Sequence, residues 1–127
     1  MSKIPGDCRY TSDHEWIRVN EDGVAVIGIT DFAQQELSDI VYVEVETVGE
    51  NLASGEVFGI VEAVKTTSDL FMPISGEVLE FNGALEDSPE TINEDPYGDG
   101  WIAKVKPSDP DEIEGLLSAE AYEAEIS

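Results

Sequence analysis

The chain has few basic side chains for its length. Its 127 residues include 6 lysines and arginines against 29 aspartates and glutamates, which gives a formal net charge of −23. Such a chain is repelled by phosphate backbones and by anionic lipid, so nucleic acids and membrane surfaces are poor partners for it. Basic protein surfaces remain, because complementary charge accelerates an encounter.

Long apolar runs are also missing. No segment approaches the roughly 20 consecutive apolar residues that a membrane-spanning helix needs. The first segment, Met1–Arg9, lacks the apolar centre of a signal peptide, so we expect a protein of the cytoplasm. We expect residues 1–9 to form a flexible tail and residues 10–127 to form a single domain.

Cysteine occurs once, at Cys8. A single cysteine rules out a disulfide within the chain and a metal site built from several thiolates. Because Cys8 lies in the predicted tail, we expect a free thiol on a mobile segment.

What the chain does contain is a series of short apolar clusters separated by Gly, Asn, Asp and Pro. This pattern predicts a mainly β domain with short helices, folded as a sandwich or flattened barrel. Asp31 and Asp109 are the expected helix caps. We expect strands at 10–20, 23–29, 40–45, 57–64, 69–72, 77–81 and 101–106, helices at 32–37, 109–117 and 119–126, and a long surface loop at 83–100.

Lys65 is the residue that most suggests chemistry. The chain has four lysines, and only this one falls between two closely spaced predicted strands. It follows the apolar run GIVEAV and precedes the polar turn TTSD, so the pattern places it at the tip of a hairpin. An exposed lysine at a turn can also serve solubility alone, so its position by itself does not decide its role.

Two segments resemble known functional motifs but lack a residue that each motif requires. Gly59–Thr66 misses a phosphate-binding loop by one residue, because β-branched Val64 stands where that loop requires glycine. His14 and Glu15 lack the second histidine that a zinc-protease helix needs. Nucleotide binding and metal catalysis therefore have no support in the sequence.

Several sequence blocks follow one another in a characteristic order. VEAVKTTSD at 61–69 precedes FMPISGEV at 71–78, and YTSDHEW, VIGITDFAQ, NEDPYG and GW begin at positions 10, 26, 93 and 100. Together these blocks resemble the glycine cleavage system H-protein family, and the first two resemble its lipoyl-lysine hairpin. The resemblance runs from about Tyr10 to Tyr122. Small departures from the family pattern fall at Ala63, Thr66 and Met72.

The resemblance implies a fold of the lipoyl/biotinyl-carrier type, with lipoic acid joined by an amide to Lys65. A member of this family is a carrier and not an enzyme, since the cofactor does the chemistry. It shuttles the aminomethyl group of glycine from the pyridoxal-phosphate glycine decarboxylase to the tetrahydrofolate-dependent aminomethyltransferase. Dihydrolipoyl dehydrogenase then restores the disulfide of the arm. A shuttle of this kind is expected to be a monomer.

The resemblance also assigns roles to acidic residues. It implies that a lipoylating enzyme reads Glu62, three residues before the lysine. It places Glu15 and Asp69 in a cleft that receives the loaded arm, where their charge would favour the cationic amine. The weaker candidates for this cleft are Ser12, Asp13 and Ser68.

Three other functions compete with this interpretation. A biotinyl carrier also presents a lysine at a hairpin tip, but Val64 and Thr66 replace the methionines that usually flank that lysine. A Schiff-base lysine would need an apolar pocket or a neighbouring cation to lower its pKa, whereas Glu62 and Asp69 lie nearby. An H-like protein that donates lipoate to other complexes would have the same sequence pattern, so this alternative stays open.

Overall fold

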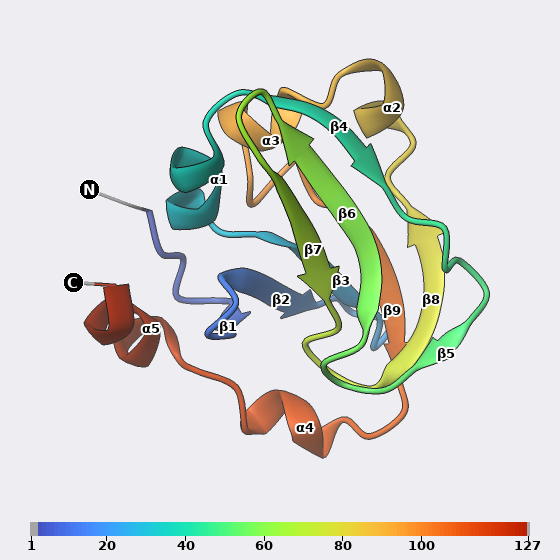
Figure 1. Cartoon of the computed structure of the whole chain (residues 1–127). Coiled ribbons are helices and arrows are strands. Elements are labelled where there is room, and N and C mark those ends of the chain that lie inside the picture. The colour runs from blue at the N-terminus through green and yellow to red at the C-terminus, as the bar shows by residue number, and fades with distance from the viewer. Residues whose placement is uncertain (1–2, 127) are drawn as a thin grey trace.

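Two antiparallel sheets form the framework of the fold (Figure 1). A computed structural model describes residues 3–126 of the chain. In this range one sheet has six strands in the order β1-β2-β3-β9-β8-β5, and the other has three in the order β4-β6-β7. The strands are β1 (Arg9–Tyr10), β2 (Glu15–Val19), β3 (Ala25–Ile29), β4 (Ile40–Glu44), β5 (Asn51–Leu52), β6 (Val57–Ala63), β7 (Thr67–Phe71), β8 (Gly76–Phe81) and β9 (Ala103–Pro107).

The core lies between the inner faces of the two sheets. Ile17, Ile27 and Val105 from the six-stranded sheet and Val43 and Val61 from the three-stranded sheet belong to one buried cluster, and each is at most 2% exposed. Branched side chains suit this pleated, buried surface, and removing them from water drives the sheets together. The predicted mainly β, sandwich-like fold with short helices is confirmed.

Five short helices fill the connections within residues 3–126, and none of them is long and apolar enough to cross a membrane. In Figure 1 the tip of the β6–β7 hairpin lies at the end of the molecule where α1 and α3 pack, and α4 lies at the opposite end. The helices are α1 (Asp31–Leu37), α2 (Ala84–Asp87), α3 (Thr91–Glu94), α4 (Asp111–Glu114) and α5 (Ala119–Ile126).

The helix caps differ from the prediction. Thr30, and not Asp31, caps α1, because its hydroxyl oxygen accepts a hydrogen bond from the Ala33 amide at 3.2 Å. Asp31 is already the first helical residue. At α4 the cap position falls on Pro110, and the helix is shorter than expected. The Asp109 carboxylate still accepts a hydrogen bond from the Asp111 amide at 3.1 Å.

Two further predictions about local structure were wrong. The segment 83–100 is not an extended surface loop, because α2 and α3 bury Leu85 and Ile92 in the main core. The predicted strand 10–20 is split by a turn, which lets β1 fold back and pair with β2. The turn contains His14 in a left-handed conformation, with φ at 64°.

Residues 3–8, which precede β1, pack against the rest of the domain. Cys8 is a free thiol, as expected, and it is only 4% exposed. The Tyr97 hydroxyl donates a hydrogen bond to the Lys3 carbonyl at 2.6 Å, and the Tyr10 hydroxyl donates one to the Pro5 carbonyl. Aromatic residues from distant parts of the chain thus cover the thiol, which the local sequence does not reveal.

Candidate functional site at the β6–β7 hairpin

The β6–β7 hairpin presents Lys65 at its tip, as predicted. The Ala63 amide donates a hydrogen bond to the Thr66 carbonyl at 2.7 Å, which closes a tight turn around Val64 and Lys65. Both of these side chains are exposed. Among residues 3–126 the Lys65 amine has no ion-pair partner. The turn therefore offers a primary amine with full access to solvent.

The base of this turn is fixed to the rest of the domain. The Val64 amide donates a hydrogen bond to the Asp39 carbonyl at 2.9 Å, and Ala63 pairs with Ile40 of β4. The Ile40 amide in turn donates to the Asn93 side-chain oxygen at 3.0 Å. Backbone bonds on both sides hold the tip, so a group attached to Lys65 swings from a rigid base.

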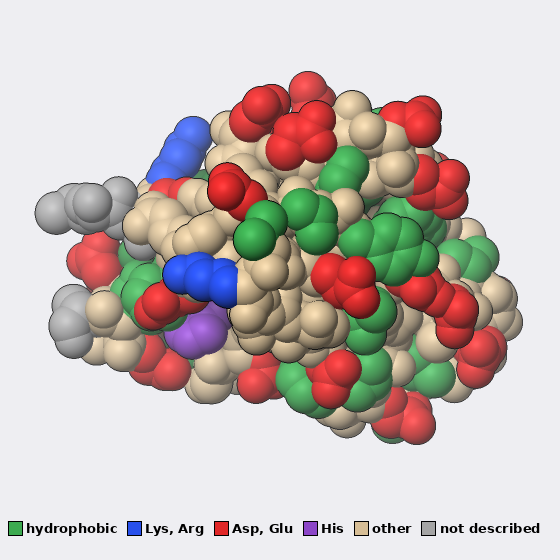
Figure 2. Space-filling model, turned by 45° about the horizontal axis from the view of Figure 1, so that its top comes forward, with side chains coloured by type: hydrophobic (Ala, Val, Ile, Leu, Met, Phe, Trp, Pro, Cys, Tyr) green, Lys and Arg blue, Asp and Glu red, His purple; other side chains and the backbone are tan. Residues whose placement is uncertain are grey.

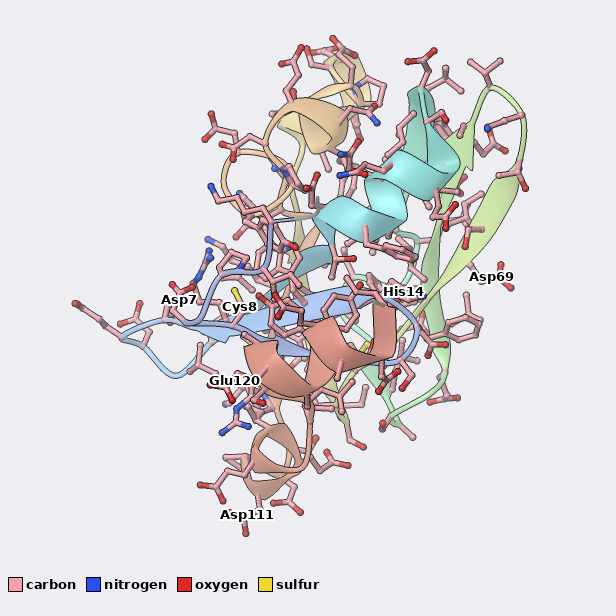
Figure 3. The ribbon with its side chains drawn as sticks, turned by 90° about the vertical axis from the view of Figure 1, so that its left-hand side faces the viewer. Asp7, Cys8, His14, Asp69, Asp111 and Glu120 are labelled. Atoms are coloured by element: carbon pink, nitrogen blue, oxygen red, sulfur yellow. The ribbon has the colours of Figure 1, made fainter. Side chains whose placement is uncertain are left out.

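A cleft of about 210 Å³ lies beside the hairpin. β7 contributes Ser68 and Asp69 to its wall. His14 comes from the turn before β2 and Glu15 from the first position of β2, and the wall facing them belongs to α1. Figure 3 shows His14 below α1 and Asp69 on β7. The two carboxyl residues that the sequence singled out thus line one cleft, together with the weaker candidate Asp13.

Glu15 is the unusual residue of this cleft. Its side chain is 2% exposed, and its Oε2 accepts a hydrogen bond from the Phe71 amide at 2.7 Å. Its Oε1 is buried and has no hydrogen-bond partner among the described residues. Burial raises the pKa of Glu15 from 4.5 to about 8, with Asp13 adding to the rise and the Phe71 amide opposing it. Glu15 is therefore a protonated acid near neutral pH and not the standing charge that the sequence suggested.

Two other residues that the sequence singled out, Glu62 and Ser12, do not line this cleft. Glu62 is half-buried on β6 and pairs with Tyr42 of β4 and Thr67 of β7. Ser12 lies outside the cleft, where its hydroxyl donates a hydrogen bond to a Glu125 carboxylate oxygen at 3.1 Å. Acidic side chains are spread over the visible surface around the hairpin end, with few basic ones among them (Figure 2).

The sequence and the fold have close counterparts among known proteins. A sequence model described as the glycine cleavage H-protein matches residues 8–127. The glycine cleavage system H protein of Bacteroides thetaiotaomicron is 56% identical over 124 residues, which cover 98% of both chains. The chain belongs to the glycine cleavage H-protein family. The H protein of Marinobacter nauticus is 52% identical over 127 residues, covering 100% of this chain and 98% of that one.

A solved structure agrees with this assignment. The crystal structure of a glycine cleavage system H protein from Mycobacterium marinum matches with a TM-score of 0.88 and 44% identity, covering 97% of this chain and 98% of that one. The H-protein family supplies the lipoyl carrier of the glycine cleavage system and bears lipoate covalently on a lysine.

The hairpin fits such a group better than the position of Lys104 does. The Lys104 amine lies 4.9 Å from the Trp101 ring centre and 3.8 Å from a Glu80 oxygen, so it is already engaged. Lys65 has a free amine, a fixed base and a cleft beside it.

The sequence argument missed His14. This residue lines the cleft and is the only histidine of the chain. From the sequence it was named in a rejected zinc motif and within the YTSDHEW block, and no role was assigned to it. Its role depends on a backbone conformation and on a tyrosine more than 100 residues away. Neither can be inferred from the residues around it.

Proposed function

We propose that Lys65 carries the lipoyl group and that the adjacent cleft shelters the aminomethyl cargo between partner enzymes. The observation that carries this proposal is an exposed lysine on an anchored turn, next to a cleft in which the buried Glu15 has an oxygen without a partner. When attached, lipoate supplies a cyclic disulfide that takes up a one-carbon unit together with an electron pair. The protein itself binds and orients, and we infer no catalytic residue in it.

The attachment site is tested by peptide mass spectrometry of the protein from its native cells. We expect a lipoyl adduct on Lys65 and on no other lysine. In vitro, a lipoate ligase should modify the wild type and the matched control Lys106→Arg, and should fail on Lys65→Arg. A biotinyl adduct would move the assignment to a biotin carrier, and an unmodified Lys65 that also resists the ligase would overturn the proposal.

Glu15 and Asp69 are the residues that we expect to receive the cationic amine of the cargo. A cation beside the unpartnered Oε1 lowers the pKa of Glu15, so its carboxyl ionises as the cation enters. Asp69 is exposed at the mouth of the same cleft and adds a second negative charge. Enclosure then keeps water from the carbon–sulfur linkage of the cargo.

This role of the cleft is tested with the loaded carrier alone. We expect Glu15→Gln and Asp69→Asn to lose the aminomethyl group to water several times faster than the wild type. Glu86→Gln, which removes an exposed carboxylate from α2, is the matched control and should match the wild type. Equal rates for all four proteins would show that the cargo does not rest in this cleft.

We further infer that Glu62 is read by the lipoylating enzyme. It lies on β6 three residues before Lys65, at the end of the hairpin that such an enzyme must grip. We expect Glu62→Gln to slow lipoylation by a ligase about tenfold, which equals the loss of one charge-assisted hydrogen bond. Glu77→Gln, equally half-buried on β8, is the control. Equal lipoylation rates in the two variants would contradict the inference.

The partners that we propose are glycine decarboxylase, the aminomethyltransferase and dihydrolipoyl dehydrogenase. The net charge of −23 favours fast, short-lived docking on basic surfaces, and this is what a shuttle requires. We expect glycine-dependent turnover with these enzymes to slow as salt is added. A monomer in the cytoplasm completes the proposal, which light scattering and cell fractionation can check.

A further inference from the structure

A buried tyrosine of the C-terminal helix reaches the wall of the cleft. Tyr122 lies on α5 and is fully buried, with its ring stacked on that of Tyr10 at a centroid distance of 4.8 Å and an interplanar angle of 9°. Its hydroxyl lies 2.9 Å from Nδ1 of His14 and 2.7 Å from the hydroxyl oxygen of Thr30. One phenol group thus joins the last helix to two residues that precede β2 and α1.

His14 needs external support. Its φ of 64° lies in the left-handed region, which is unfavourable for a residue other than glycine and persists only where neighbours impose it. The His14 amide donates to the Thr11 carbonyl at 3.1 Å, and the His14 carbonyl accepts from the Thr30 amide at 3.0 Å. The bond to Tyr122 fixes the side chain as well. Because Glu15 follows His14 directly in the chain, the backbone conformation of His14 determines where the Glu15 side chain lies.

The opposite wall of the cleft depends on the same hydroxyl group. Thr30 caps α1 by accepting a hydrogen bond from Ala33, and α1 supplies Phe32 and Leu37 to the cleft. The Phe32 ring also packs against the His14 ring, with centroids 4.7 Å apart. A displacement of the Tyr122 hydroxyl would therefore disturb both walls together.

We propose that Tyr122 is a positioning residue for the cleft. Its hydroxyl fixes the His14 ring and the Thr30 cap relative to each other, so that the cleft keeps the shape that shelters the cargo. This inference rests on the proposed function of the cleft. Tyr122 touches neither the carrier lysine nor the cargo, and it acts only through His14 and Thr30.

The first test is Tyr122→Phe in the unmodified chain. Phenylalanine keeps the stack on Tyr10 and removes only the hydroxyl group. Because His14 is the only histidine, the ring nitrogen resonances of a ¹⁵N-histidine-labelled protein report on it without ambiguity. We expect the Nδ1 resonance to shift and the balance between the two ring tautomers to change. An unchanged histidine spectrum would overturn the proposal.

Tyr97→Phe is the matched control. Tyr97 is also buried in the aromatic cluster, and its hydroxyl also makes two hydrogen bonds, donating to Lys3 and accepting from the Asp31 amide at 3.0 Å. Neither partner touches His14, so this variant should lose comparable stability in urea and leave the histidine spectrum as in the wild type. Equal spectral changes in both variants would show a general loosening of the aromatic cluster, and they would overturn the specific role of Tyr122.

The second test measures the rate at which the loaded, lipoylated carrier loses its aminomethyl group to water without partner enzymes. We expect Tyr122→Phe to lose it about fivefold faster than the wild type, as the loss of one ordered hydrogen bond implies, and Tyr97→Phe to stay within about twofold. A histidine spectrum that changes while the rate does not would overturn the positioning role. If Glu15→Gln also leaves the rate unchanged, the cleft does not hold the cargo and the proposed function itself has failed.

Discussion

Glu15 should make the stability of the protein fall as pH rises. The folded protein keeps a proton on Glu15 up to about pH 8, whereas the unfolded chain releases it near pH 4.5. Between these values the folded state binds more protons, so raising the pH favours unfolding by about 1.4 kcal/mol per pH unit from this group. The full loss reaches about 4 to 5 kcal/mol above pH 8, a large part of the stability of a typical domain.

Glu15→Gln isolates this contribution. Glutamine has the shape of the protonated acid, can accept the Phe71 hydrogen bond and does not titrate. We expect the variant to be more stable than the wild type by about 1.4 kcal/mol at pH 5.5, where the unfolded chain has already released this proton, and by at most about 4 to 5 kcal/mol at pH 8.5. The other acidic groups titrate in both proteins, so the difference between the two curves belongs to Glu15.

Glu36→Gln provides the matched control for this experiment. Glu36 also lines the cleft but is exposed, so its substitution should shift stability by less than about 0.5 kcal/mol at any pH. If the unfolding free energies of wild type and Glu15→Gln run parallel from pH 5.5 to 8.5, the burial argument is refuted. The unpartnered oxygen would then have a partner in solution.

Three further results are expected. Burial raises the pKa of Cys8 to about 11. The folded protein should therefore react with a thiol reagent at pH 7.5 at least about 100-fold more slowly than the protein unfolded in urea. A fast reaction would show that the segment around Cys8 opens. Thr30→Val removes the α1 cap and should lower the unfolding free energy by about 1 kcal/mol, whereas Thr30→Ser should not. A Cβ at Gly28 would lie 2.7 Å from the Trp16 indole nitrogen, so Gly28→Ala should destabilise by about 1 to 3 kcal/mol and change the tryptophan fluorescence, and a neutral substitution would contradict this packing.

The sequence predicted the elements whose signal is local. The hairpin around Lys65 follows from an apolar run, a polar turn and a second strand, and these patterns depend only on neighbouring residues. The segment 83–100 is different, since its polar residues resemble a loop and only tertiary packing on Leu85 and Ile92 turns it into helices. Polar composition alone cannot show that a few apolar side chains in such a segment reach the core.

In the candidate site, too, some features could be predicted from the sequence and others depend on tertiary packing. Glu15 and Asp69 were singled out by resemblance, and both line one cleft beside the hairpin. The protonated state of Glu15 was not foreseen, because it depends on how completely other segments cover the carboxyl group. The Thr30 cap and the Tyr122 hydrogen bonds likewise depend on backbone geometry and on residues far away in the chain.

The bridge between β1 and the segment before α5 has a consequence for synthesis on the ribosome. Tyr10 and Leu117 exchange two backbone hydrogen bonds of 2.9 Å, although more than 100 residues separate them. At about 5 to 20 residues per second, Tyr10 waits roughly 5 to 20 s before Leu117 is made. During that time the turn that holds His14 lacks its support from Tyr122 as well, so the growing chain can pair its early strands long before it can complete the cleft.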